Sequence, residues 1–125
     1  MASREIRDLS PEMQVLYNKF YDRVRRDVEL AKRGLTILPI CTYRSVEEQA
    51  KLLGAGKTSV KPGKSKHNMT TPRGQPAAEA VDVIMLEYGQ PMTVGAHGAE
   101  LADHAKAVGL VMTISERGAY HLQKE

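Results

Sequence analysis

One amphipathic helical pattern dominates the first third of the chain. Apolar residues recur at spacings of three and four from Met13 to Val28, a spacing typical of a helix with one buried face. Ser10 and Pro11 are favoured residues at a helix start, and Gly34 is a favoured helix stop. We therefore predict one long helix over residues 11–33, with a basic, solvated outer face.

Short apolar runs and a second set of helix signals fill the rest of the chain. Ser45 and Glu48 form a capping-box pattern that opens a short helix. Residues 54–79 are rich in Gly, Pro, Lys, Ser and Thr, which indicates a long loop. Pro39 argues against a fully paired central position for its strand. The other predicted elements are strands over 35–43, 79–86, 110–114 and 119–123 and a helix over 95–109.

The order of these elements indicates the fold class. Helices and strands mix without a regular alternation of strand and helix, which favours an α+β fold. We expect a small, mostly antiparallel sheet flanked by helices. The length of 125 residues suits a single domain over residues 1–125.

Composition limits the functional classes. Hydrophobic residues make up 42% and charged residues 26% of the chain, a balance typical of globular proteins. We expect no membrane insertion and no signal peptide, since no apolar run approaches about 20 residues and the start has no apolar core. The net charge of +3 favours an anionic partner, either nucleic acid or a bacterial envelope. The absence of Trp argues against stacking on single strands.

The single cysteine, Cys41, excludes an intrachain disulfide. It lies in the apolar run "LTILPIC", and free cysteines in such runs are most often buried and inert. We therefore interpret Cys41 as a structural thiol.

Three polar residues in or beside apolar runs are candidates for chemistry. Asp82 interrupts "AVDVIM", His67 lies in the long loop, and His121 lies in the last predicted strand. Each alone has an ordinary structural explanation, but two His and one carboxylate are an accepted ligand set for catalytic Zn²⁺. The spacing is not a local metal motif and does not establish a site. His97 and His104 compete as ligands and rank lower, because a turn and an exposed helix face are expected for them.

Three ordered segments resemble a known family. "SKHN…PAAEAVDV" is similar to the S-x-H…A-x-D signature of the zinc D,D- and L,D-peptidases of bacterial cell walls, which include VanX/VanY-type D-Ala-D-Ala peptidases and phage L-alanyl-D-glutamate endolysins. "TYRSVEEQAKLLGAG" resembles the arginine-bearing segment of that family, and "GLVMTISERGAYHLQ" resembles its closing segment. The resemblance covers residues 35–125 and implies a hedgehog/D-Ala-D-Ala-peptidase-like fold.

The resemblance also implies residue roles. It makes His67, Asp82 and His121 the ligands of Zn²⁺, and it makes Arg44 the cation that polarises the scissile carbonyl or stabilises the oxyanion. Ser65 falls at a substrate-contacting position. A metal-bound water with a lowered pKa would attack the peptide carbonyl.

Two features depart from the family pattern. Gly118 occupies the position where the family has an acidic general base. We take Glu116 as the base, with Glu125 as a second candidate and a catalytically weak zinc protein as a third possibility. The residues 68–77 are an insertion that could form a flap over the cleft or carry specificity.

These inferences lead to an expected function. We expect a zinc peptidase that cleaves peptidoglycan stem peptides or cross-links, of the D,D-carboxypeptidase or L-alanyl-D-glutamate endopeptidase type. A phage or prophage endolysin fits best: a monomer held in the host cytoplasm until lysis, with peptidoglycan rather than nucleic acid as its partner. The alternatives are a non-catalytic zinc- or cell-wall-binding relative and a small basic nucleic-acid-binding module.

Overall fold

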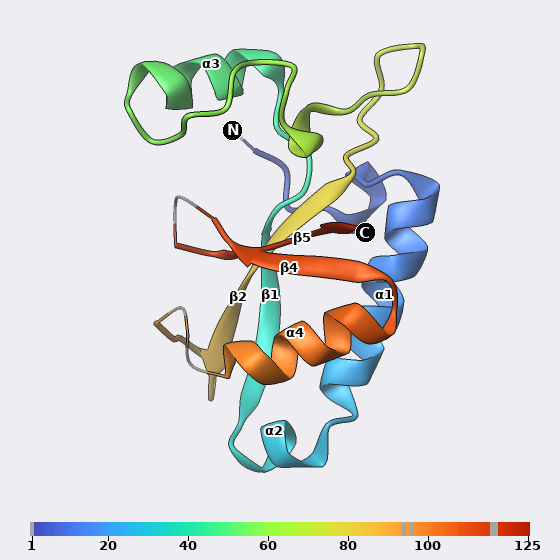
Figure 1. Cartoon of the computed structure of the whole chain (residues 1–125), viewed down its shortest axis with the longest axis vertical. Coiled ribbons are helices and arrows are strands. Elements are labelled where there is room, and N and C mark those ends of the chain that lie inside the picture. Colours follow the sequence, from blue (N-terminus) through green and yellow to red (C-terminus); the bar gives the residue numbers. More distant parts are fainter. Residues whose placement is uncertain (1, 94, 96, 116–117) are drawn as a thin grey trace.

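A computed structural model describes residues 2–93, 95, 97–115 and 118–125 of the chain (Figure 1). Its elements, in chain order, are η1 (Ile6–Asp8), α1 (Pro11–Arg25), α2 (Val28–Lys32), β1 (Leu35–Cys41), α3 (Val46–Gly54), η2 (Lys66–Asn68), β2 (Ala80–Glu87), β3 (Gln90–Pro91), α4 (Gly98–Ala107), β4 (Leu110–Ile114) and β5 (Tyr120–Lys124). No helix in the described ranges is long and apolar enough to span a membrane.

The strands form one sheet in the order β1-β2-β5-β4, with β3 paired to β2, and each of these pairings is antiparallel. This confirms the predicted α+β class with a small antiparallel sheet. The short strand β3 was not predicted. Pro39 is tolerated because β1 pairs with β2 along one edge only, and the register shifts between Pro39 and Cys41.

The hydrophobic core lies between one face of the sheet and the helices α1 and α4. Alternate residues of β2 face this core, namely Val81, Val83 and Met85, and Leu122 of β5 pairs with Val81 in the same layer. The helices contribute Met13, Tyr17, Phe20, Val24, Leu101 and Ala105. Because side chains alternate along a strand, Asp82 and His121 point to the opposite face.

The prediction of one helix over residues 11–33 is wrong. α1 ends at Arg25, and α2 begins at Val28. Asp27 leaves the helical conformation and its Oδ1 accepts hydrogen bonds from the backbone N–H groups of Glu29 and Leu30, which starts a new helix. An Asp at an N-cap stabilises such a start, so a local cap interrupts the apolar periodicity.

The helix α3 lies at one end of the molecule, away from α1 and α4 (Figure 1). Ser45 caps it as predicted, because its Oγ accepts a hydrogen bond from the backbone N–H of Glu48. The segment that follows leads to η2, whose His67 contacts Asp82 on the face of the sheet opposite the core. α3, this segment and η2 therefore build one side of the candidate site.

Candidate functional site

The site begins with a row of side chains that crosses the sheet. Cys41 of β1 is the register partner of Asp82 in β2, Asp82 is the partner of His121 in β5, and His121 is the partner of Thr113 in β4. Register partners in antiparallel strands present their side chains on the same face. The irregular register after Pro39 is what brings Cys41 opposite Asp82, so the sheet alone places an acid, an imidazole and a thiol side by side.

His67 reaches this row from η2. Ser65 caps η2, because its Oγ accepts a hydrogen bond from the backbone N–H of His67 at 3.1 Å. The neighbouring Asn68 donates from Nδ2 to the carbonyl of Arg44 at 2.7 Å, and the Arg44 N–H donates to the carbonyl of His67 at 2.9 Å. These bonds hold the His67 ring, which is only 3% exposed, over Asp82.

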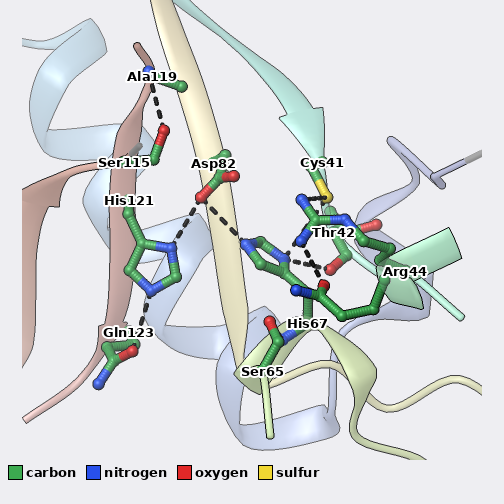
Figure 2. Close-up of polar contacts among 11 residues, drawn as sticks. Cys41, Thr42, Arg44, Ser65, His67, Asp82, Ser115, Ala119, His121 and Gln123 are labelled. Carbon is green, nitrogen blue, oxygen red and sulfur yellow. Dashed lines mark hydrogen bonds and ion pairs between the residues drawn. The ribbon is translucent and has the colours of Figure 1, made fainter. Parts of the chain in front are cut away.

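The two imidazole rings converge on one carboxylate oxygen (Figure 2). His67 Nε2 lies 3.1 Å and His121 Nδ1 lies 2.8 Å from the same atom, Asp82 Oδ1. The ring centroids are 5.2 Å apart and the rings are nearly perpendicular, at 76°. Asp82 is only 6% exposed. The structure thus brings together the three residues that the sequence proposed as ligands.

The outer nitrogens of the two rings show which nitrogens carry hydrogen. His67 Nδ1 lies 2.7 Å from the carbonyl of Thr42, and His121 Nε2 lies 2.9 Å from Oε1 of Gln123. The carbonyl of Thr42 can only accept, so Nδ1 of His67 donates to it, and in the described orientation of the Gln123 amide Nε2 of His121 donates to Oε1. In a neutral His67 ring Nε2 then carries a lone pair, and this lone pair points at the carboxylate oxygen of Asp82. Such an arrangement requires a cation between them, either a proton or a metal ion.

The electrostatics agree with this requirement. Burial alone would lower the pKa of His67, but the hydrogen bond to Asp82, together with the contacts to Cys41, outweighs burial and raises it to about 9. Burial would raise the pKa of Asp82, but hydrogen bonds from His121 and His67 hold it well below its usual range. Without a metal the site is therefore a cationic imidazolium beside a carboxylate. Two imidazoles and one carboxylate also fit a divalent ion such as Zn²⁺.

Cys41 adds a second, overlapping donor set. Cys41, His67 and Asp82 are all buried, and one donor atom from each lies within 4.8 Å of the others. Cys41 is buried, as the sequence interpretation expected. That interpretation did not include His67 and Asp82 as its neighbours. The thiol lies 3.6 Å from Nδ1 of His67, whereas Asp82 faces Nε2. No sequence signal marks this contact, because it depends on the register shift in β1.

A cavity of about 260 Å³ opens over these residues. Arg44, Ser65, His67, Asp82 and His121 line it, together with Gln49, Lys57, Thr58, Val60 and the β4 end Thr113–Ser115. Arg44 is 6% exposed, donates from Nη1 to Gln49 Oε1 and from Nη2 to Cys41 Sγ, and its Nε has no partner in the described part of the chain. Arg44 and Ser65, the two residues expected to contact substrate, both line this cavity, and so do Gln49 and Lys57, which were not site candidates.

The predicted general base, Glu116, lies outside the described residues. Gly118 adopts φ +79°, and its N–H donates to the carbonyl of Ser115. This conformation favours glycine, which is why no acid stands there. Glu125, the second candidate, lines a different cavity with Lys66 and Glu79. Asp82 is the carboxylate that lines the site cavity within the described ranges.

The remaining candidates lie elsewhere. His97 faces Glu100, at 3.5 Å, and does not line the site cavity. His104 donates to Asp27 at 2.8 Å, and its side chain is mostly buried, so the expectation that it is exposed is wrong. The insertion 68–77 does not contribute to the described lining of the cavity either. Lys57, Thr58 and Val60 form that wall instead.

Comparisons with known proteins show a similar fold in a solved structure. No family model matches the chain, and no curated protein matches it. Among solved structures, it is similar to the crystal structure of the L-Ala D-Glu endopeptidase ChiX of Serratia marcescens, with a TM-score of 0.65 and 15% sequence identity. The match covers 100% of this chain and 89% of that chain. The α+β fold of this chain is therefore that of an L-Ala D-Glu endopeptidase.

Proposed function

We propose that this chain is a metal-dependent peptidase that acts on peptidoglycan peptides. The observation that carries the proposal is the convergence of His67 Nε2 and His121 Nδ1 on one oxygen of the buried Asp82, in the lining of a cavity. The likeness in fold to a cell-wall endopeptidase supports it.

His67, Asp82 and His121 would hold the ion, with Zn²⁺ the best fit to two imidazoles and a carboxylate. When bound, the ion supplies a water of lowered pKa and an electrophilic centre for the peptide carbonyl. Thr42 and Gln123 orient the two rings through their outer nitrogens, as hydrogen-bond partners of metal-binding histidines commonly do.

Arg44 supplies the positive charge beside this centre. Its guanidinium lines the cavity and forms no ion pair with a described carboxylate, so its charge is available to the oxygen that becomes negative during attack. Ser65 lies in the same wall and would contact the substrate backbone. Glu116 would take the proton from the attacking water and pass it to the leaving amine.

The test is release of free amines from purified peptidoglycan, with and without a chelator. We expect cleavage that the chelator abolishes and that zinc restores. Arg44→Met should reduce kcat by about 100-fold, the typical loss when one oxyanion-stabilising donor is removed. His97→Ala is the matched control and should keep wild-type activity, because His97 lies outside the cavity. Metal-independent cleavage would contradict the proposal.

Cleavage assays with a panel of defined substrates would identify the scissile bond. L-Ala-D-Glu, the diaminopimelate cross-link and D-Ala-D-Ala peptides distinguish an endopeptidase from a carboxypeptidase. An endolysin role further requires that the protein lyse cells from within only when the inner membrane is permeabilised. A protein that binds metal and cell wall without cleaving any of the three substrates would instead be a non-catalytic relative.

A further inference from the structure

Gln49 is an unusual residue for the inner face of a helix. It is the buried residue of α3, with 0% exposure, whereas Val46 and Leu53 of the same helix are exposed. Glutamine is seldom fully buried unless both ends of its amide are hydrogen-bonded. The partners of the Gln49 amide therefore indicate why it occupies this position.

Both ends of the amide are used. Gln49 Oε1 accepts from Arg44 Nη1 at 2.8 Å, and Gln49 Nε2 donates to the carbonyl of Val60 at 2.8 Å. The amide cannot be reversed, since its NH₂ group would then face the donors of Arg44 and its oxygen would face a carbonyl. One side chain thus connects the cationic group of the cavity to the segment that forms its wall.

Gln49 is uncharged, so its hydrogen bond to Arg44 leaves the positive charge of the guanidinium in place. A buried cation without a carboxylate partner is unfavourable, and the usual solution is an ion pair. Here the described hydrogen-bond partners of the guanidinium are an amide oxygen and a thiol, and its Nε has no partner in the described part of the chain. The charge of Arg44 contributes to lowering the pKa of Glu48, but the two side chains form no described ion pair. Gln49 therefore fixes the orientation of Arg44 without cancelling its charge, whereas a glutamate at this position would cancel it.

The other end of the amide acts on the cavity wall. Lys57, Thr58 and Val60 line the cavity, and the segment that contains them is exposed at Lys57 and follows the end of α3. The bond from Gln49 to Val60 fastens this segment to the inner face of α3.

We propose that Gln49 is a positioning residue that holds Arg44 in the cavity as a cation without an ion-pair partner among the described residues and that it anchors the Lys57–Val60 wall. The first half of this role rests on the proposed peptidase function. The second half does not, because it concerns the resting structure alone.

The test compares Gln49→Glu and Gln49→Met with Gln75→Glu in the full-length protein. Gln75 is an exposed glutamine in the segment between η2 and β2, so its variant makes the same charge change away from the cavity. Gln49→Glu keeps an acceptor for Arg44 but neutralises the cation and cannot donate to Val60. Gln49→Met has a similar size and makes neither bond.

Two readouts are expected to change. In Gln49→Glu, kcat should fall by about 100-fold with little change in KM and with bound metal retained, because a stabilising charge is lost mainly in the transition state. In both Gln49 variants, tryptic cleavage after Lys57 should become several-fold faster, because the wall opens more readily. Gln75→Glu should match the wild type in both readouts.

Wild-type kcat in Gln49→Glu, or wild-type tryptic rates in both Gln49 variants, would overturn the proposal. If only one of the two Gln49 variants folds, the rate of tryptic cleavage after Lys57 in that variant decides. An inactive wild type would contradict the peptidase function, whereas unchanged proteolysis after Lys57 would contradict the role of Gln49, so the two failures are distinguishable.

Discussion

At the scale of single residues, the sequence identified the acid and the two imidazoles but not their surroundings. Asp82 was recognisable because a polar residue in an apolar run needs a partner, and the family resemblance added His67 and His121. Cys41 and Gln49 were not recognisable, since their contacts depend on the β1 register and on the packing of α3. The position of the general base was also not predictable from a pattern in which Gly118 replaces the expected acid.

The charge state of His67 makes the stability of the metal-free protein depend on pH. Its pKa is raised from 6.5 to about 9 in the folded state, so its stabilising contribution is complete below pH 6.5 and is lost as the pH rises through about 9. The upper limit of this loss is roughly 3 kcal/mol, because each pKa unit corresponds to about 1.36 kcal/mol. The pKa shift of Asp82 has the opposite sign. Its stabilising contribution is present at neutral pH and is lost as the pH falls below the usual pKa of an aspartate.

Urea unfolding of the chelator-treated protein between pH 6 and pH 9 measures this dependence. We expect the free energy of unfolding to fall with rising pH in the wild type. The fall should be much smaller in His67→Gln, which has no titrating ring at this position. Equal slopes for the two proteins would show that His67 does not hold a proton against Asp82.

At the scale of elements, the prediction from sequence failed at a local helix cap and at a short exposed strand. The 3.6-residue periodicity predicted a helix over 11–33 correctly in type, but Asp27 divides it, because its side chain offers the backbone a new helix start. The strands were predicted closely, since β5 buries alternate residues and β2 is a mostly buried apolar run. The short β3 was missed, since two exposed residues carry no hydrophobic pattern.

Replacement of Asp27 tests the break between α1 and α2. Asp27→Ala removes the cap of α2 and the bond from His104, and we expect it to cost about 1–2 kcal/mol of stability. Asp22→Ala is the control: it removes only exposed ion pairs with Arg25 and Arg26, which contribute about 0–1 kcal/mol. Urea denaturation measures both variants. A smaller loss in Asp27→Ala than in Asp22→Ala would contradict the capping role.

Replacement of Gly118 tests the strain at its positive φ. Gly118→Ala should cost about 1–2 kcal/mol, because φ +79° is unfavourable for a residue with a Cβ even where space is open. Gly54→Ala at the end of α3 is the control; it has open space and no positive φ, so we expect a change within about 0.5 kcal/mol. Equal stabilities of the two variants in urea denaturation would argue against strain at Gly118.

At the scale of the whole molecule, charge is distributed unevenly along the chain. Residues 49–78 contain no Asp or Glu and six basic residues: Lys51, Lys57, Lys61, Lys64, Lys66 and Arg73. The remaining twelve Lys and Arg are outnumbered by all fifteen acids, so the rest of the chain has a net charge of −3. The basic stretch also supplies Lys57, Ser65 and His67 to the cavity, so the positive charge lies on the side where a substrate would arrive.

This asymmetry predicts salt-dependent binding to cell walls. The fraction of protein that co-sediments with purified cell walls should decrease as the NaCl concentration rises from about 50 mM to about 300 mM, since salt screens exposed charges. Lys61→Gln combined with Lys64→Gln should weaken binding and flatten the salt dependence. Lys19→Gln combined with Arg23→Gln, an equal charge change on the exposed face of α1, should have little effect. Identical behaviour of the two pairs would show that net charge alone matters.

The metal content of the purified protein tests the central claim most directly, because His67–Asp82–His121 and Cys41–His67–Asp82 share two of their three residues. Elemental analysis of wild type, His121→Ala and Cys41→Ala separates them. We predict about one metal ion per chain in wild type and in Cys41→Ala, and loss of the ion in His121→Ala, since a catalytic site needs three protein ligands. Metal retained in His121→Ala and lost in Cys41→Ala would contradict the account.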